Sequence, residues 1–319
     1  MRYKKLKIFL CLAAMLIIIL DSRCAISGAV EGLNICLYTV IPALFPYSVL
    51  SLLFQTLIAG QDIKHLSPIE KLLKIPQRSG VIFLLGILGG YPTGAICTKK
   101  SGINRNTAET MTVFCNNAGP SFIFGIVSMI FPKFTTLLLI WFIQVTSAII
   151  TGILLNKNAD TCSYIIAPQR NSNVIQEAIA AMVKVCSTII LFRVLLSCVK
   201  MHLNPLWGQE IFTLILGVLE LTNGIIDLNQ IPSESLRFIV CCSLLSFGGI
   251  CVAIQTLFIA TNIRLGKYLL GKLLHAIISG TLAAMTLYSP ILILVVPIVS
   301  ILIIVNISSK GKKAVAFFS

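Results

Sequence analysis

Apolar segments that are interrupted in the middle by helix-breaking residues constrain this chain more than any other feature. Two interruptions carry the sequences GGYPTGA, at 89–95, and FCNNAGP, at 114–120. Apolar stretches that approach the ~20 residues of a membrane-spanning helix recur along the whole chain. Backbone groups that face lipid without a hydrogen-bond partner are strongly unfavourable. Each interruption must therefore lie against protein or a water-filled cavity.

The composition places the rest of the chain in the membrane as well. The 319 residues are 57% hydrophobic and 11% charged, with a mean hydropathy of +0.96. The apolar runs are continuous rather than alternating, which predicts a polytopic α-helical membrane protein. The net charge is +14, and most of it lies at span ends, where it sets orientation and contacts anionic lipid. We therefore expect membrane lipid, and no nucleic acid, as the partner of these charges.

The sequence carries no motif of an enzyme or a metal site. Nearly all of the 11 cysteines lie in apolar runs, none forms a CxxC pair, and the three histidines are scattered. This pattern is typical of cysteine used as a small buried hydrophobe. Walker, HExxH and GxSxG patterns do not occur. We predict no enzyme activity, no catalytic residue, no metal and no cofactor.

The first half of the chain divides into an anchor and a repeat. A basic N-terminus before an apolar run predicts an uncleaved signal-anchor helix over 1–27. A first repeat follows over 28–155. Its predicted elements are a span kinked by Pro42 and Pro46, a half-span over 81–88, a re-entry from Asn106 that breaks at NNAGP, and an ordinary span over 135–155. The half-span and the polar segment after it predict a re-entrant hairpin.

The second half resembles the first in pattern. After a cytoplasmic linker over 156–173, a second repeat is predicted over 174–308, with Glu177 in the place of Glu31, and a basic cytoplasmic tail over 309–319. Its predicted elements are a half-span over 211–219 stopped by ELTNG, a break at SFGGI over 246–250, and closing spans near 273–287 and 291–304. A shift of 130 positions aligns Gly94 with Gly224 and Gly119 with Gly249.

The charges predict that the two halves are inverted. Basic residues at the N-terminus place that end in the cytoplasm. With eight crossings and two re-entrant hairpins, the basic loop over 99–105 falls inside and the acidic loop over 227–235 falls outside. The predicted fold class is an all-α polytopic membrane protein with two inverted repeats, each with a re-entrant helical hairpin and a broken transmembrane helix.

Inverted repeats with broken helices are the pattern of secondary transporters, whose binding site lies near the midplane. The breaks place these polar side chains at mid-depth: Thr93, Asn116, Asn117, Glu220, Thr222, Asn223 and Gln255. We also expect Gly94 and Gly224 to form turns with positive φ. The structural alternative is that glycine and proline serve only helix packing.

Charged side chains within the predicted spans are the sharpest site candidates, because a charge at that depth needs a role or a partner. Glu220 is the strongest, and Arg193 is its candidate ion-pair partner. Whether that pair is structural or functional stays open. Lys184 and Glu109 are expected nearer the interface, and His275 is expected as an interface residue rather than a ligand.

The stretch GGYPTGAICTKKSGINRNTAETMTVFCNNAGPSFIFGIV resembles the signature of the nucleoside-recognition, or Gate, family of membrane proteins. Within it the chain is most similar to the YlbJ-like sporulation integral membrane proteins, and GVLELTNG and SFGGICVAIQ fit that subgroup. The matching site positions are Tyr91, Pro92, Thr93 and Gly94, then Asn116, Asn117 and Pro120, and in the second half Glu220, Thr222, Asn223 and Gly224.

The resemblance implies a fold related to the concentrative nucleoside transporters. For the subgroup it implies a role in moving dipicolinate from the mother cell towards the forespore. The expected location is a bacterial cell membrane, in particular the outer forespore membrane. Two functions stay open: a transporter of dipicolinate or a nucleoside-like solute, and a non-transporting assembly component of the sporulation membrane. A homo-oligomer also stays open.

Overall fold

A computed structural model describes residues 2–58, 66–156, 173–260 and 263–289, and the elements in these residues are helices. Five helical segments are long and apolar enough to cross a membrane: Ser22–Ile58, Phe134–Leu155, Val174–Val199, Glu234–Ile259 and Leu265–Tyr288. These segments confirm a multi-pass helical membrane protein. The predicted last span near 291–304, the tail over 309–319 and most of the linker over 156–173 lie outside the described residues.

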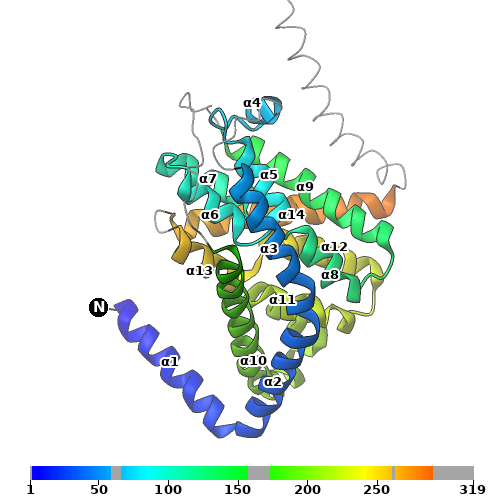
Figure 1. Ribbon diagram of the computed structural model, residues 1–319. Coiled ribbons are helices and arrows are strands. Elements are labelled where there is room, and N and C mark those ends of the chain that lie inside the picture. The colour runs from blue at the N-terminus through cyan, green and yellow to red at the C-terminus, as the bar shows by residue number, and fades with distance from the viewer. Residues whose placement is uncertain (1, 59–65, 157–172, 261–262, 290–319) are drawn as a thin grey trace, which may run out of the picture.

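The N-terminal helices form an arm and a long span. Helix α1 (Arg2–Leu20) leaves the body of the molecule and meets α2 (Ser22–Ile35) at a sharp angle (Figure 1). A π-helical turn, η1 (Cys36–Val40), joins α2 to α3 (Ile41–Ile58). In this turn the Ile41 N–H bonds to the Cys36 carbonyl. A π-helical turn of this kind is a known way for a helix to accommodate an irregular residue such as Pro42 without ending.

The first-half breaks lie where the sequence predicts them. Helix α4 (Ser67–Leu73) precedes the broken helices, which are α5 (Gly80–Gly89), α6 (Thr93–Lys100), α7 (Arg105–Cys115) and α8 (Pro120–Gly125). A short 3-10 turn, η3 (Val127–Met129), leads into α9 (Phe134–Leu155). Helix interruptions at 90–92 and at 116–119 are therefore confirmed.

The second half contains the same order of helices after one long element. Helix α10 (Val174–Leu219) combines the predicted span and half-span and bends at Gly208, whose φ is 75°. It is followed by α11 (Leu221–Ile226), η4 (Asp227–Gln230), α12 (Glu234–Phe247), α13 (Gly249–Ile259) and α14 (Leu265–Tyr288). The predicted breaks at ELTNG and SFGGI are confirmed at Glu220 and Gly248.

The helix bounds follow the predicted shift of 130 positions. Shifted by 130, α5 becomes 210–219, which are the last ten residues of α10. In the same way α7 becomes 235–245, within α12, and α9 becomes 264–285, which nearly coincides with α14. The order of elements therefore repeats. The inverted orientation of the halves and the re-entrant path of their hairpins stay predictions.

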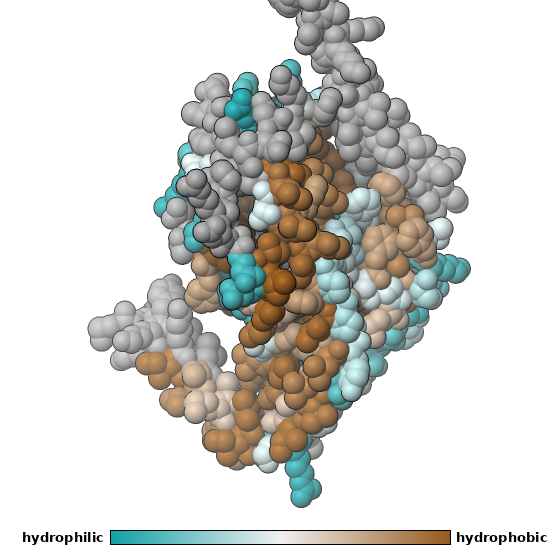
Figure 2. Space-filling view, in the orientation of Figure 1, coloured by the Kyte–Doolittle hydropathy of each residue, from teal (hydrophilic) through white to brown (hydrophobic). Residues whose placement is uncertain are grey.

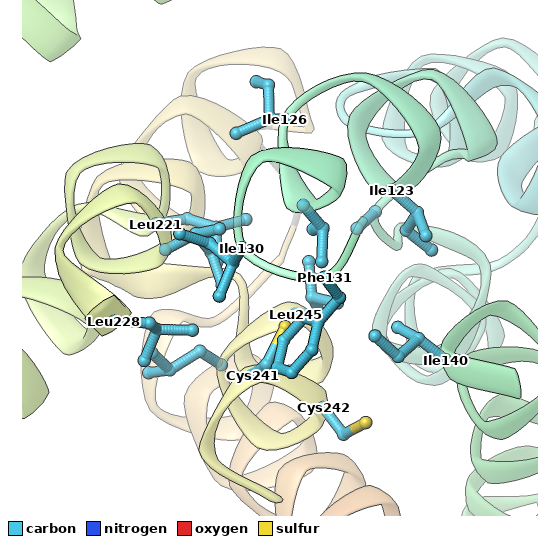
Figure 3. Close-up of a cluster of buried hydrophobic side chains, with 14 of the residues drawn as sticks. Ile123, Ile126, Ile130, Phe131, Ile140, Leu221, Leu228, Cys241, Cys242 and Leu245 are labelled. Atoms are coloured by element: carbon cyan, nitrogen blue, oxygen red, sulfur yellow. The ribbon is translucent and has the colours of Figure 1, made fainter. Parts of the chain in front are cut away.

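Both halves contribute to one core, and a separate apolar face points outward. Isoleucines of α8 and its continuation pack against residues of α11, η4 and α12 (Figure 3). Phe131 and Phe238 meet edge to face across this boundary, with ring centroids 6.1 Å apart. The outward face over α3 and α10 is largely apolar (Figure 2), and it exposes Leu50, Leu57 and Val183. Such a face suits lipid, whereas the shared core packs residues of the two halves against each other.

Cysteine labelling from outside the cell tests the predicted topology. We replace Asn106 and Gln230, both exposed, one at a time in a background without native cysteines. A membrane-impermeant maleimide should label Gln230→Cys and spare Asn106→Cys, because the first loop is predicted inside and the second outside. Labelling of Asn106→Cys alone would overturn the inverted arrangement.

Candidate functional site

The four helix breaks adjoin one another in the middle of the described structure. A Cβ atom placed on Gly90 would lie 2.8 Å from the backbone nitrogen of Gly119, so the first two breaks touch. A Cβ on Gly248 would lie 2.5 Å from the Tyr91 hydroxyl, and one on Gly249 would lie 3.2 Å from the Leu221 nitrogen. The breaks of both halves are therefore contiguous, as a shared site requires.

The two glycines that the sequence analysis singled out act differently from the prediction. Gly94 and Gly224 lie within helices α6 and α11 and have no positive φ, so that prediction was wrong. Their role is close approach. A Cβ on Gly94 would lie 2.1 Å from the Cys115 carbonyl oxygen, and one on Gly224 would lie 2.0 Å from the Gly217 Cα. Positive φ occurs instead at the breaks, for example at Gly90 and Gly248.

The end of α7 brings the two predicted asparagines onto a buried lysine. The Lys272 ammonium donates to the carbonyls of Val113 (3.3 Å) and Asn116 (2.7 Å) and to Oδ1 of Asn117 (3.1 Å). Its Nζ also lies 5.2 Å from the centroid of the Tyr91 ring. Three of the predicted site residues are thus gathered around a cation that the prediction did not include.

Lys272 was missed because the closing span was placed too late in the sequence. The predicted closing span begins near residue 273, which leaves Lys272 outside it. In the structure α14 begins at Leu265, so Lys272 lies two turns inside the helix and is fully buried. The signal in the sequence is the apolar run YLL directly before GK, which allows the helix to start before the lysine.

Asn116 reaches into the second half of the chain. Its Nδ2 donates to the hydroxyls of Thr256 (2.9 Å) and Tyr268 (3.3 Å). Its Oδ1 is buried and has no hydrogen-bond partner. Asn117 instead closes its own break, because its Nδ2 donates to the Phe114 carbonyl at 2.6 Å. Of the two amides, Asn116 keeps an acceptor free for a solute.

Glu220 is the N-cap of α11. Its two carboxylate oxygens accept from the backbone nitrogens of Thr222 (3.1 Å) and Asn223 (2.7 Å). A carboxylate at a helix N-terminus satisfies the free N–H groups and opposes the positive end of the helix dipole. Asn223 adds a bond from Nδ2 to the Ile189 carbonyl (3.2 Å), and its Oδ1 is buried without a partner.

The candidate ion pair between Arg193 and Glu220 is corrected by the structure. The Arg193 guanidinium contacts both Asp227 oxygens at 3.1 Å and also Glu31. Asp227 was expected in an exterior loop, and its burial next to Arg193 could not be inferred from sequence spacing. Glu220 therefore has no ion-pair partner among the described residues.

Three further predicted residues lie at or near the breaks. The Tyr91 hydroxyl donates to the Leu245 carbonyl at 3.1 Å, which bridges the first break to the end of α12. Thr93 is buried at the start of α6. Gln255 is half-buried and bonds to the Thr188 hydroxyl (3.0 Å) on α10, so it faces that helix rather than the asparagines.

A second buried polar cluster joins α9, α12 and α14. Gln144 Nε2 donates to the Cys242 carbonyl and the Ser246 hydroxyl, both at 2.9 Å. His275, three residues after Lys272, is fully buried with Nε2 2.9 Å from the Ser147 hydroxyl, so its expected interface position was wrong. Gln144 Oε1 and His275 Nδ1 have no partner.

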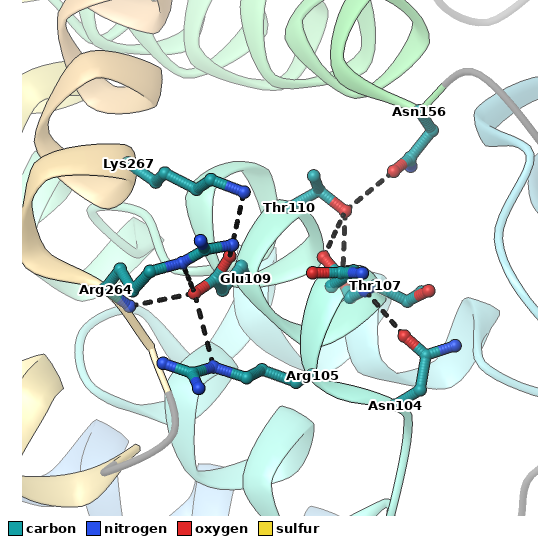
Figure 4. Close-up of polar contacts among 9 residues, drawn as sticks. Asn104, Arg105, Thr107, Glu109, Thr110, Asn156, Arg264 and Lys267 are labelled. Atoms are coloured by element: carbon teal, nitrogen blue, oxygen red, sulfur yellow. Dashed lines mark hydrogen bonds and ion pairs between the residues drawn. The ribbon is translucent and has the colours of Figure 1, made fainter.

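A charged clasp joins α7 to the start of α14 (Figure 4). Glu109 accepts two bonds of 2.8 Å from the Arg264 guanidinium and one of 3.0 Å from the Arg264 backbone nitrogen. Lys267 and Arg105 lie 3.5 and 3.7 Å away. Hydrogen bonds from Arg264 lower the pKa of Glu109 to about 2. Glu109 is outside the five candidate spans, and its three cations are about half exposed.

Comparison with known proteins gives one curated relative. The sporulation integral membrane protein YlbJ of Bacillus subtilis (strain 168) is 27% identical to the chain over 121 residues. The match covers 35% of this chain and 29% of the relative's length. No protein-family model and no solved structure matches the chain. The chain is therefore similar to a sporulation integral membrane protein, while its place in the Gate family stays a prediction.

Replacing Gly94 with alanine tests the close approach of the breaks. The added methyl group would collide with the Cys115 carbonyl, and we expect a loss of about 1–3 kcal/mol in stability, typical of overpacking. Gly266→Ala is the matched control, since a Cβ there meets nothing within 4 Å. Thermal unfolding in detergent measures both variants. An unchanged melting temperature for Gly94→Ala would contradict the packing role.

The pH dependence of stability tests the Glu109 clasp. Because the folded pKa is lowered, the contribution of Glu109 is present above its ordinary pKa of 4.5 and is lost as the pH falls towards about 2. Glu109→Gln should lower stability at pH 7 by about 1–2 kcal/mol, an amount moderated by the exposure of its partners. The variant should also flatten the thermal-unfolding profile between pH 5 and 3 (a window of about two units). A slope identical to that of the wild type would exclude the clasp.

Proposed function

We propose that the chain is an integral membrane solute transporter of the nucleoside-recognition, or Gate, type. The observation that carries this proposal is the meeting of four helix breaks, two from each half, around buried polar side chains. Irregular backbone at membrane depth is tolerated where it is covered by protein or lines a cavity, and transporters use it to bind solutes. The repeated order of helices supports the same conclusion.

Two buried amides supply groups for a solute. Asn116 and Asn223 stand at breaks of opposite halves, and each has an Oδ1 atom without a partner. A buried unpaired acceptor is unfavourable by roughly 1–3 kcal/mol, which a bound donor group or water would relieve. In the proposed mechanism the two halves move against each other around these residues, so that the site opens to one side of the membrane at a time.

Dipicolinate is the solute that we propose first. The relative in Bacillus subtilis is named a sporulation integral membrane protein, and the motif resemblance implies dipicolinate movement towards the forespore. Dipicolinate is a planar dianion, and Glu220 would repel it if the carboxylate pointed freely into the site. Both Glu220 oxygens are instead engaged by N–H groups of α11, which reduces that conflict. The proposed location is the outer forespore membrane.

Two other functions are separated by one measurement. A nucleoside-like solute would use the same amides, and a non-transporting assembly component would use none of them. Purified protein in proteoliposomes is tested for uptake of labelled dipicolinate and of labelled uridine. Uptake of either one supports transport and identifies the solute class. A folded, oriented preparation that takes up neither would favour the assembly role.

Variants at the breaks test the proposed site. Asn117→Ala removes the contacts to Lys272 and Phe114, and Glu220→Gln leaves one acceptor for two N–H groups of α11. We expect each to depress dipicolinate uptake roughly 5- to 150-fold, corresponding to about 1–3 kcal/mol. In a spore-forming host they should yield dipicolinate-poor spores.

The matched controls are Asn106→Ala and Glu234→Gln, which change exposed residues of the same types. Uptake by these controls should equal that of the wild type, and membrane abundance of all four variants should be normal. Full uptake by both Asn117→Ala and Glu220→Gln would refute the site.

A further inference from the structure

We infer that Lys272 selects solutes that carry a carboxylate, because its buried ammonium is held by neutral oxygens beside the face of Tyr91. This inference rests on the proposed transport function and names the chemistry of its site. It concerns a residue outside the sequence motifs that carry the family resemblance.

The charge of Lys272 lies far from water. The side chain is 0% exposed and stands in α14, one of the five candidate spans. Charged residues inside membrane segments are rare, and they generally mark solute or ion pathways. A lysine that served only to close a helix end would carry a cost that a neutral donor such as glutamine avoids.

Some of the buried ionisable side chains in the described structure have ion-pair partners of opposite sign, and Lys272 is among those that have none. Arg193 is neutralised by Asp227 and Glu31, and Glu109 by Arg264. Among the described residues no carboxylate forms an ion pair with Lys272. The negative end of the α7 dipole offsets only part of a full charge. An anionic solute would supply the remainder.

The surroundings fit a planar aromatic carboxylate. Lys272 Nζ lies 5.2 Å from the Tyr91 ring centroid, and a flat ring stacked near Tyr91 would bring its carboxylate towards the ammonium. Two of the three Lys272 contacts, to Val113 (3.3 Å) and to Asn117 (3.1 Å), are longer than the third. Exchanging one of them for a carboxylate oxygen would replace a long contact to a neutral acceptor with a stronger bond between two charged groups.

A purely structural lysine makes a different prediction. If Lys272 only caps α7, its removal should lower stability and weaken the binding of all solutes equally. If it binds the carboxylate of the solute, its removal should weaken the binding of charged solutes and leave the binding of a neutral solute of the same shape unchanged. Three probes separate these outcomes: dipicolinate, picolinate, and the uncharged pyridine-2,6-dicarboxamide.

The experiment measures binding to purified protein and uptake into proteoliposomes for the wild type, Lys272→Gln and Lys272→Arg. The control, Lys267→Gln, removes an exposed charge from the same helix. We expect Lys272→Gln to weaken dipicolinate binding about 10- to 150-fold, as for a lost charge-assisted bond. The affinity for the dicarboxamide should change less than about twofold, a difference within the usual error of such free energies. Lys272→Arg should retain part of the preference for carboxylates.

The following results would contradict the inference or separate it from the transport proposal. Equal weakening of all three probes, or unchanged dipicolinate affinity in a folded Lys272→Gln protein, would overturn the inference. If that variant fails to insert, wild-type protein that binds the dicarboxamide as tightly as dipicolinate would overturn it as well. Wild-type protein that binds dipicolinate with charge selectivity but shows no uptake would refute transport and leave the carboxylate-reading role supported. Wild-type protein that binds none of the probes would overturn both.

Discussion

The need to satisfy the backbone hydrogen-bonding groups at the broken helix ends is the physical constraint on which the rest of this structure depends. Each break leaves N–H and C=O groups that lipid cannot satisfy. Side chains at the breaks and on neighbouring helices satisfy them. Lys272 donates to carbonyls at the end of α7, the Tyr91 hydroxyl to that of Leu245, and the Tyr47 hydroxyl to that of Leu88 at 2.6 Å. Glu220 accepts the N–H groups of α11. Two of these groups are ionisable, the basic Lys272 at a helix C-terminus and the acidic Glu220 at a helix N-terminus, and each stands where the helix dipole favours its charged form.

In this arrangement the polar side chains at the breaks have two competing roles, in structure and in contact with a solute. A side chain that closes a helix end holds the break in place, and the same side chain is the nearest polar group to any solute that enters. Tight backbone contacts, such as that of Gly94 with Cys115, leave little freedom to rearrange the helix ends themselves. A solute of the proposed transporter would therefore compete for the side chains, and by the inference above Lys272 would gain most from a new partner.

The sequence predicted the breaks well because a break is a local property. Clusters of proline, glycine and asparagine strongly favour a helix end, so the interruptions near Gly90, Asn116 and Gly248 could be placed without a structure. The partners of the charges could not be predicted in this way. Arg193 pairs with Asp227 and Glu31, and Lys272 lies inside a span, because helix register and packing decide which side chains meet. Spacing along the chain contains little of that information.

Helices α7 and α14 are joined at two levels, one through partly exposed ion pairs and one through a buried lysine. Near the start of α7, the acid Glu109 is held by basic residues at the beginning of α14 that are about half exposed. At its end, the carbonyl of Asn116 is held by the buried Lys272 further along α14. The exposed level is screened by salt and can open by exchanging partners with water. The buried level can open only when another acceptor replaces the carbonyls. In the proposed transporter, a movement of α7 relative to α14 would therefore require Lys272 to exchange these carbonyls for another acceptor.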